Sequence, residues 1–70
     1  MTSRVLHTEE APGGKGKAVI SLVDEHFEID YYDDSGRHFF NEEFHNHTFR
    51  YVEDAAENWA VGIKKLEDTA

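Results

Sequence analysis

The chain has 70 residues, and its 15 acidic side chains against 7 basic ones give a formal net charge of −8. This length holds one domain with a small core. Nucleic acid and anionic membranes recruit clusters of Lys and Arg, so the charge argues against both as direct partners. The chain has no cysteine, so neither a disulfide framework nor a thiolate zinc site is expected.

The sequence has no apolar run near the roughly 18 residues that span a membrane. Its first ten residues, MTSRVLHTEE, lack the apolar stretch of a secretory signal. No cofactor-binding motif is found. We therefore expect a cytoplasmic protein without a cofactor.

The N-terminal residues 1–16 are predicted to form a flexible tail. The sequence EEAPGG within them contains the only proline beside two glycines, which is typical of loops. A short strand from Arg4 to His7 is an optional addition at the edge of a sheet. The folded domain is expected to cover residues 17–68.

Three strands are predicted next. KAVISLVD at residues 17–24 is β-branched and apolar, and HFEIDYY at 26–32 alternates apolar and polar side chains. A turn at Asp24–Glu25 joins them, and DDSGR offers Asp and Gly for a second turn. The third strand runs from Arg37 to about Phe44. Its inward face stays open because Phe39 and Phe40 are neighbours. Phe44 is in phase only with Phe40, unless a bulge shifts the register.

A helix from Phe49 to about Glu67 is predicted from the change of period, with Asn46 or Thr48 as its N-cap. Its apolar stripe consists of Val52, Ala55, Ala56, Trp59, Ala60, Ile63 and Leu66. One amphipathic helix must cover the apolar face of the sheet to form a core. The predicted fold is therefore α+β, an antiparallel three-stranded meander packed against one C-terminal helix (β-β-β-α).

Partner-binding residues are predicted on two surfaces. The polar face of the sheet presents Glu28, Asp30, Tyr32 and His38, and the outer face of the helix presents Glu53, Asp54, Glu57 and Val61. Two helix carboxylates four residues apart, Glu53 and Glu57, could act as an acid–base pair if one were desolvated, but the position of the apolar stripe leaves both in solvent. We therefore predict a non-enzymatic protein-binding module.

Metal binding is an alternative. Imidazole and carboxylate ligands of the kind that zinc prefers are supplied by His38, Glu42 or Glu43, His45 and His47. Their spacing is loose and they fall near the junction of strand and helix, so ordinary surface histidines are the preferred interpretation.

The spread of carboxylates offers a further alternative. Acidic side chains along the turns, the outer sheet face and the helix would imitate the phosphates of DNA and occupy the basic cleft of a nucleic-acid enzyme. A charge that only keeps a small domain in solution is the simpler explanation.

The segments HFEIDYYDDSGRHFFNEEF and YVEDAAENWAVGI together resemble small uncharacterised proteins of tailed bacteriophages, over residues 26–66. The resemblance implies a phage accessory protein that binds or inhibits a host protein in the host cytoplasm. A homodimer is also expected, because a three-stranded sheet has open edges and a thin core.

Overall fold

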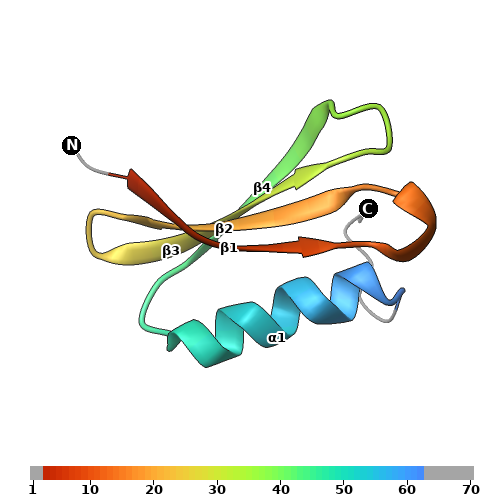
Figure 1. Ribbon diagram of the computed structural model, residues 1–70. Coiled ribbons are helices and arrows are strands. Elements are labelled where there is room, and N and C mark those ends of the chain that lie inside the picture. Colours follow the sequence, from red (N-terminus) through yellow and green to blue (C-terminus); the bar gives the residue numbers. More distant parts are fainter. Residues whose placement is uncertain (1–2, 63–70) are drawn as a thin grey trace.

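A computed structural model of the protein describes residues 3–62. It contains a four-stranded antiparallel sheet in the order β1-β2-β3-β4, with one helix across one face (Figure 1). The elements are β1 (Ser3–Glu10), the 3-10 turn η1 (Pro12–Gly14), β2 (Lys17–Val23), β3 (His26–Tyr32), β4 (His38–Phe44) and α1 (Phe49–Ala60). The α+β class is confirmed, but the sheet has four strands where the main prediction had three.

The additional strand is β1. It pairs with β2 from Ser3 opposite Val23 to Glu10 opposite Lys17, so it extends beyond the optional segment Arg4–His7. Half of the region predicted as a flexible tail is thus part of the sheet. A shift of register between Val5 and His7 interrupts the pairing.

Short polar turns connect β2 to β3 and β3 to β4. Asp24, in the two-residue connection of β2 and β3, has a φ of 56°, a conformation that Asp tolerates better than most residues. The Asp33 carboxylate accepts hydrogen bonds from Ser35 N (3.0 Å), Ser35 Oγ (2.7 Å) and Arg37 N (2.9 Å), while Gly36 takes a φ of 88°. The predicted turn chemistry is therefore present at Asp33 and Gly36.

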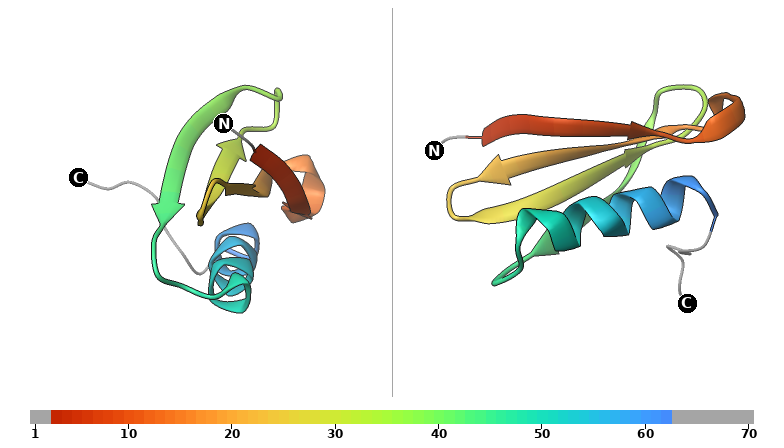
Figure 2. Two further views of the ribbon diagram at one scale, coloured as in Figure 1. Left: turned by 90° about the vertical axis from the view of Figure 1, so that its left-hand side faces the viewer. Right: turned by 60° about the horizontal axis from the view of Figure 1, so that its bottom comes forward.

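The core lies between α1 and one face of the sheet, and it includes Phe44 at the end of β4. Ile20, Ile29, Tyr31 and Val52 are fully buried there, together with Ala18 and Ala56. The helix packs against β1, β2 and β3, and Figure 2 shows it running beneath them. Side chains at alternate positions of β2 and β3 face the helix, as their sequence pattern predicts.

The helix begins and ends at residues suited to its termini. The Thr48 hydroxyl accepts a hydrogen bond from Tyr51 N (3.2 Å), which decides between the two predicted N-caps. After Ala60, Gly62 has a φ of 89° and its N–H donates to the Trp59 carbonyl (3.0 Å). The helix therefore stops before the predicted end at Glu67, and residues 63–67 lie outside the described part of the chain. No helix within residues 3–62 is both long and apolar enough to cross a membrane.

Candidate functional site

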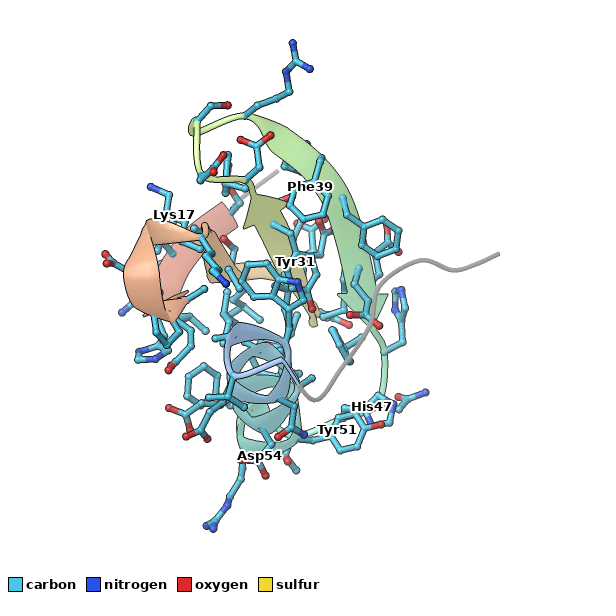
Figure 3. All side chains as sticks on the ribbon, turned by 90° about the vertical axis from the view of Figure 1, so that its right-hand side faces the viewer. Lys17, Tyr31, Phe39, His47, Tyr51 and Asp54 are labelled. Atoms are coloured by element: carbon cyan, nitrogen blue, oxygen red, sulfur yellow. The ribbon has the colours of Figure 1, made fainter. Side chains whose placement is uncertain are left out.

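The start of β4 exposes a cluster of aromatic rings. A register shift puts Tyr31 opposite Phe40 and Tyr32 opposite His38, so Phe39 is the extra residue of a bulge. The Phe39 ring lies 6.4 Å from Tyr31 and 6.5 Å from Trp59, between ring centroids. Phe39 is 47% exposed and Phe40 38%. Figure 3 shows Phe39 beyond Tyr31, on the side away from the helix.

Tyr31 connects this aromatic cluster to the core. Its ring lies 5.0 Å from Trp59, and its hydroxyl donates a hydrogen bond to Glu42 Oε1 (3.0 Å). Burial raises the pKa of the Tyr31 hydroxyl well above its ordinary value, and the Glu42 charge and hydrogen bond raise it further. The Tyr31 hydroxyl therefore keeps its proton at neutral pH and donates a hydrogen bond to Glu42.

The opposite face of the sheet holds a network of polar side chains on β3 and β4, which we call the outer-face network. Asn41 Nδ2 donates to Glu28 Oε1 (3.0 Å) and to Asp30 Oδ1 (2.8 Å). Asp30 is also hydrogen-bonded to His38 Nε2 (2.9 Å), and Glu28 to His26 Nε2 (2.7 Å). These contacts across two strands hold the carboxylates in fixed positions on the sheet surface.

The predicted partner-binding residues divide between two sides of the molecule. Glu28, Asp30, Tyr32 and His38 come together on the outer sheet face, where the Tyr32 and His38 rings are 5.3 Å apart. Glu53, Asp54, Glu57 and Val61 lie on or directly after α1, which covers the other face. One partner surface therefore cannot touch all eight residues.

The four predicted metal-ligand candidates do not come together. His38 and His45 are separated by the length of β4, about 20 Å at the usual rise of a strand. Glu42 faces the helix side, where it accepts from Tyr31, and the His47 ring stacks on Tyr51 at 4.1 Å. The structure instead places His45 beside Glu43, the alternative to Glu42, and beside His26, which is not among the predicted ligands. The register of β3 with β4 brings His26 into this group, and the sequence alone does not determine that register.

A shallow hollow of about 550 Å³ lies between the β1–β2 connection and the β3–β4 turn. Its lining includes Gly13, Gly14, Lys17 and Asp33. The Asp33 carboxylate is engaged within its own turn, whose hydrogen bonds from Ser35 and Arg37 hold its pKa below the ordinary value. The Lys17 ammonium lies 5.4 Å from the centre of the Tyr32 ring. These contacts stabilise the loops that line the hollow.

The fold and these surfaces define a small α+β protein with an exposed aromatic cluster and a polar outer sheet face. No protein-family model, curated protein or solved structure matches the chain. Its function must therefore be argued from its own residues.

Proposed function

We propose that the protein is a non-enzymatic binding module that takes up an extended segment of a partner protein along the outer edge of β4. The observation that carries this proposal is the exposure of Phe39 and Phe40, 47% and 38%, on a strand at the edge of the sheet. Exposed aromatic side chains of this size are typical anchors of protein interfaces.

The edge supplies backbone hydrogen bonds. Within residues 3–62, β4 has a strand neighbour on one side only, and its pairing with β3 is regular from Phe40 to Phe44. An extended segment that adds as a further strand would pair with the backbone groups on the other side. Such a segment gains main-chain hydrogen bonds independently of its sequence.

The two faces of β4 supply specificity. Phe40 lies on the helix side, whereas Asn41 and Glu43 lie on the outer face beside Asp30 and Glu28. Because successive side chains of a strand point to opposite faces, a bound segment would place apolar residues beside Phe40 and Lys or Arg beside Glu43. The net charge of −8 favours a basic partner by electrostatic steering.

A second copy of the chain is a poorer occupant of this edge. Pairing two β4 strands would bring Glu42 and Glu43 of both copies near one another, on chains that each carry a net charge of −8. Like charges on neighbouring strands are destabilising. The expected homodimer is therefore not the preferred assembly at β4.

The phage resemblance makes a host protein in the cytoplasm the expected partner. A nucleic-acid-binding enzyme is one such basic partner, and DNA mimicry is then a special case of the same proposal. Competition by DNA distinguishes that case.

Selection of peptides from a random library of extended segments tests the proposal. The baits are the native protein, the double variant Phe39→Ser/Phe40→Ser and the matched variant Val5→Ser. Val5 is 63% exposed on β1, the opposite edge of the sheet. Peptides selected by the native protein should alternate apolar and basic residues. They should bind Val5→Ser with unchanged affinity, and their affinity for the double variant should be at least about tenfold lower, which is about 1.4 kcal/mol of binding free energy.

Equal binding to the native protein and the double variant would overturn the proposal. Selected peptides without alternation would also contradict it, as would a concentration-dependent dimer that Phe39→Ser/Phe40→Ser abolishes. Raising the salt concentration should weaken binding of the basic peptides. A host protein that binds the native protein tests DNA mimicry. If double-stranded DNA does not compete with the native protein for that host protein, DNA mimicry is excluded.

A further inference from the structure

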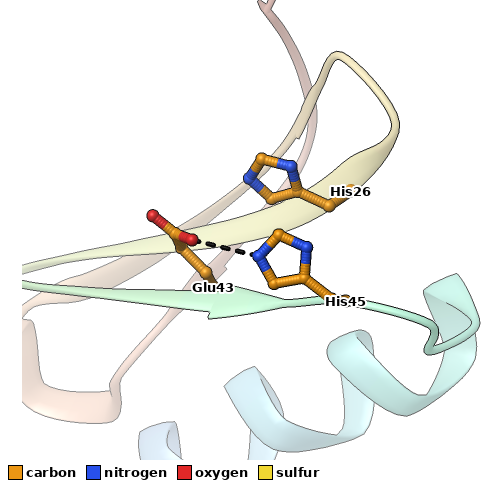
Figure 4. A group of neighbouring side chains, drawn as sticks. All are labelled: His26, Glu43 and His45. Atoms are coloured by element: carbon orange, nitrogen blue, oxygen red, sulfur yellow. Dashed lines mark hydrogen bonds and ion pairs between the residues drawn. The ribbon is translucent and has the colours of Figure 1, made fainter.

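Two histidines and one carboxylate meet on the outer sheet face at the end of β4 remote from Phe39. His26, Glu43 and His45 each offer a ligand atom, and these atoms all lie within 4.8 Å of one another (Figure 4). Among residues 3–62, this is the one group of three such side chains that could hold a metal ion. We call it the His-Glu-His cluster.

The strand register produces this cluster. Phe27 pairs with Phe44 and Glu28 with Glu43, so His26 and His45 come to lie side by side at the adjoining ends of β3 and β4. Their rings are stacked, with centroids 4.4 Å apart and planes 27° apart. Glu43 Oε1 lies 3.1 Å from His45 Nε2. The backbone pairing thus fixes the positions from which all three side chains extend.

A fourth residue orients one of the imidazoles. Glu28 Oε2 is 2.7 Å from His26 Nε2, and these two side chains are only 18% and 19% exposed. This contact holds the His26 ring in its position beside Glu43 and His45. Carboxylates that orient a ligating histidine are a common feature of metal sites.

We propose that the His-Glu-His cluster binds one divalent transition-metal ion, with zinc as the ion to test first. Two imidazole nitrogens and a carboxylate oxygen are the ligands that zinc takes in three-residue sites, where a fourth position stays open to water. Zinc–ligand bonds of about 2.0–2.1 Å in tetrahedral geometry place the ligand atoms about 3.3 Å apart. Side-chain rotation closes the remaining distance, since Glu43 is 54% and His45 58% exposed.

The other histidine–carboxylate pairs show what is special here. His7 with Glu9 and His38 with Asp30 have comparable bond lengths of 3.0 Å and 2.9 Å. In each of these pairs one imidazole meets a carboxylate, whereas the His-Glu-His cluster brings two imidazoles to one carboxylate. His38 is therefore the matched control, because it is an exposed histidine at the other end of the same strand.

The test is calorimetric titration of the untagged protein with zinc chloride, compared with His26→Ala, His45→Ala and His38→Ala. The native protein should bind one zinc ion, and His38→Ala should bind it equally well. His26→Ala and His45→Ala should lose measurable binding, and Glu28→Gln should weaken it about tenfold through loss of the orienting carboxylate. Titration with cobalt(II) should give the visible absorption of a low-coordinate N/O site in the native protein and in His38→Ala.

Melting temperatures in the presence of a chelator show whether each variant is folded. With folded variants, zinc binding that survives both His26→Ala and His45→Ala overturns the proposal. It is equally overturned if the native protein takes up no zinc at saturating excess, or if His38→Ala reduces binding as much as His45→Ala does. A variant that fails to fold is replaced by the conservative change Glu43→Gln, which should weaken binding without altering the melting temperature of the metal-free protein.

Discussion

The two ends of β4 carry the same side chain in very different surroundings. Phe40 and Phe44 lie four residues apart on one face of the strand, yet Phe40 is 38% exposed and Phe44 only 7%. The start of α1 returns beneath the end of β4, where the Phe44 ring lies 6.0 Å from both His47 and Tyr51. The start of β4 rises away from the helix (Figure 1).

The aromatic side chains of β4 therefore fall into two groups: those that stabilise the core and those that are exposed and can contact a partner. At the covered end, Phe44 joins the core with Val52 and Ile29. At the open end, the bulge gives β4 an additional residue, and Phe39 contacts Tyr31 and Trp59 at the margin of the core. A small domain can spare little buried apolar area, so uncovered rings at one end point to an interaction there.

The largest expected effect is the loss of the covered ring. Phe44→Ala should lower the free energy of unfolding by about 3 kcal/mol, because it removes a buried ring and leaves a cavity. Phe40→Ala is the matched control and should cost about 1 kcal/mol, since much of its ring remains in water in the folded state. Urea denaturation followed by Trp59 fluorescence measures both. Equal losses of stability would show that the ring of Phe44 is no more important to the core than the ring of Phe40.

A smaller effect is expected at Tyr31, which lies between the aromatic cluster at the open end and the core. Tyr31→Phe removes the hydroxyl that donates to Glu42 and should cost about 1.5 kcal/mol near neutral pH. The folded-state pKa of Tyr31 is raised, so the hydroxyl stabilises the fold fully below the unfolded pKa of about 10. That stabilisation is lost as the pH rises above this value, because the unfolded state then releases the proton more readily.

The check is denaturant unfolding between neutral and strongly alkaline pH. The native protein should lose more stability than Tyr31→Phe does over the alkaline range, so that the two curves converge. Tyr32→Phe, on the outer face, is the control and should leave the slope of the native protein unchanged. Parallel curves for the native protein and Tyr31→Phe would contradict the role assigned to this hydroxyl.

The alternation of β2 and β3 and the polar turns made the central hairpin predictable. Glu28 and Asp30 were placed correctly on the outer face for the same reason. β1 was predicted only as an optional strand over Arg4–His7, because its residues are mostly exposed and a bulge at Leu6 breaks their alternation. An edge strand buries little, so its sequence carries a weak pattern.

The His-Glu-His cluster could not be predicted for a different reason. It depends on which residue of β4 lies opposite His26, and that register is shifted by the bulge at Phe39. Two adjacent phenylalanines allow either face to be the buried one until the helix has docked. Long-range contacts, and not local pattern, decide such a register.

The smallest of the expected effects probes the link between the two ends of β4. Thr48→Ala removes the cap of α1 and should cost about 1 kcal/mol, with Thr48→Ser as the control that keeps the hydroxyl. Amide exchange should speed up at Tyr51 and Val52, in the first turns of the helix that cover Phe44. Binding of peptides at Phe39 and Phe40 should stay unchanged, because Thr48 caps the first turn of α1, whereas the helix residue beside Phe39 is Trp59 in the last turn. If the loss of the cap weakens peptide binding as well, the open end depends on the start of the helix, and the division between a structural and an available end fails.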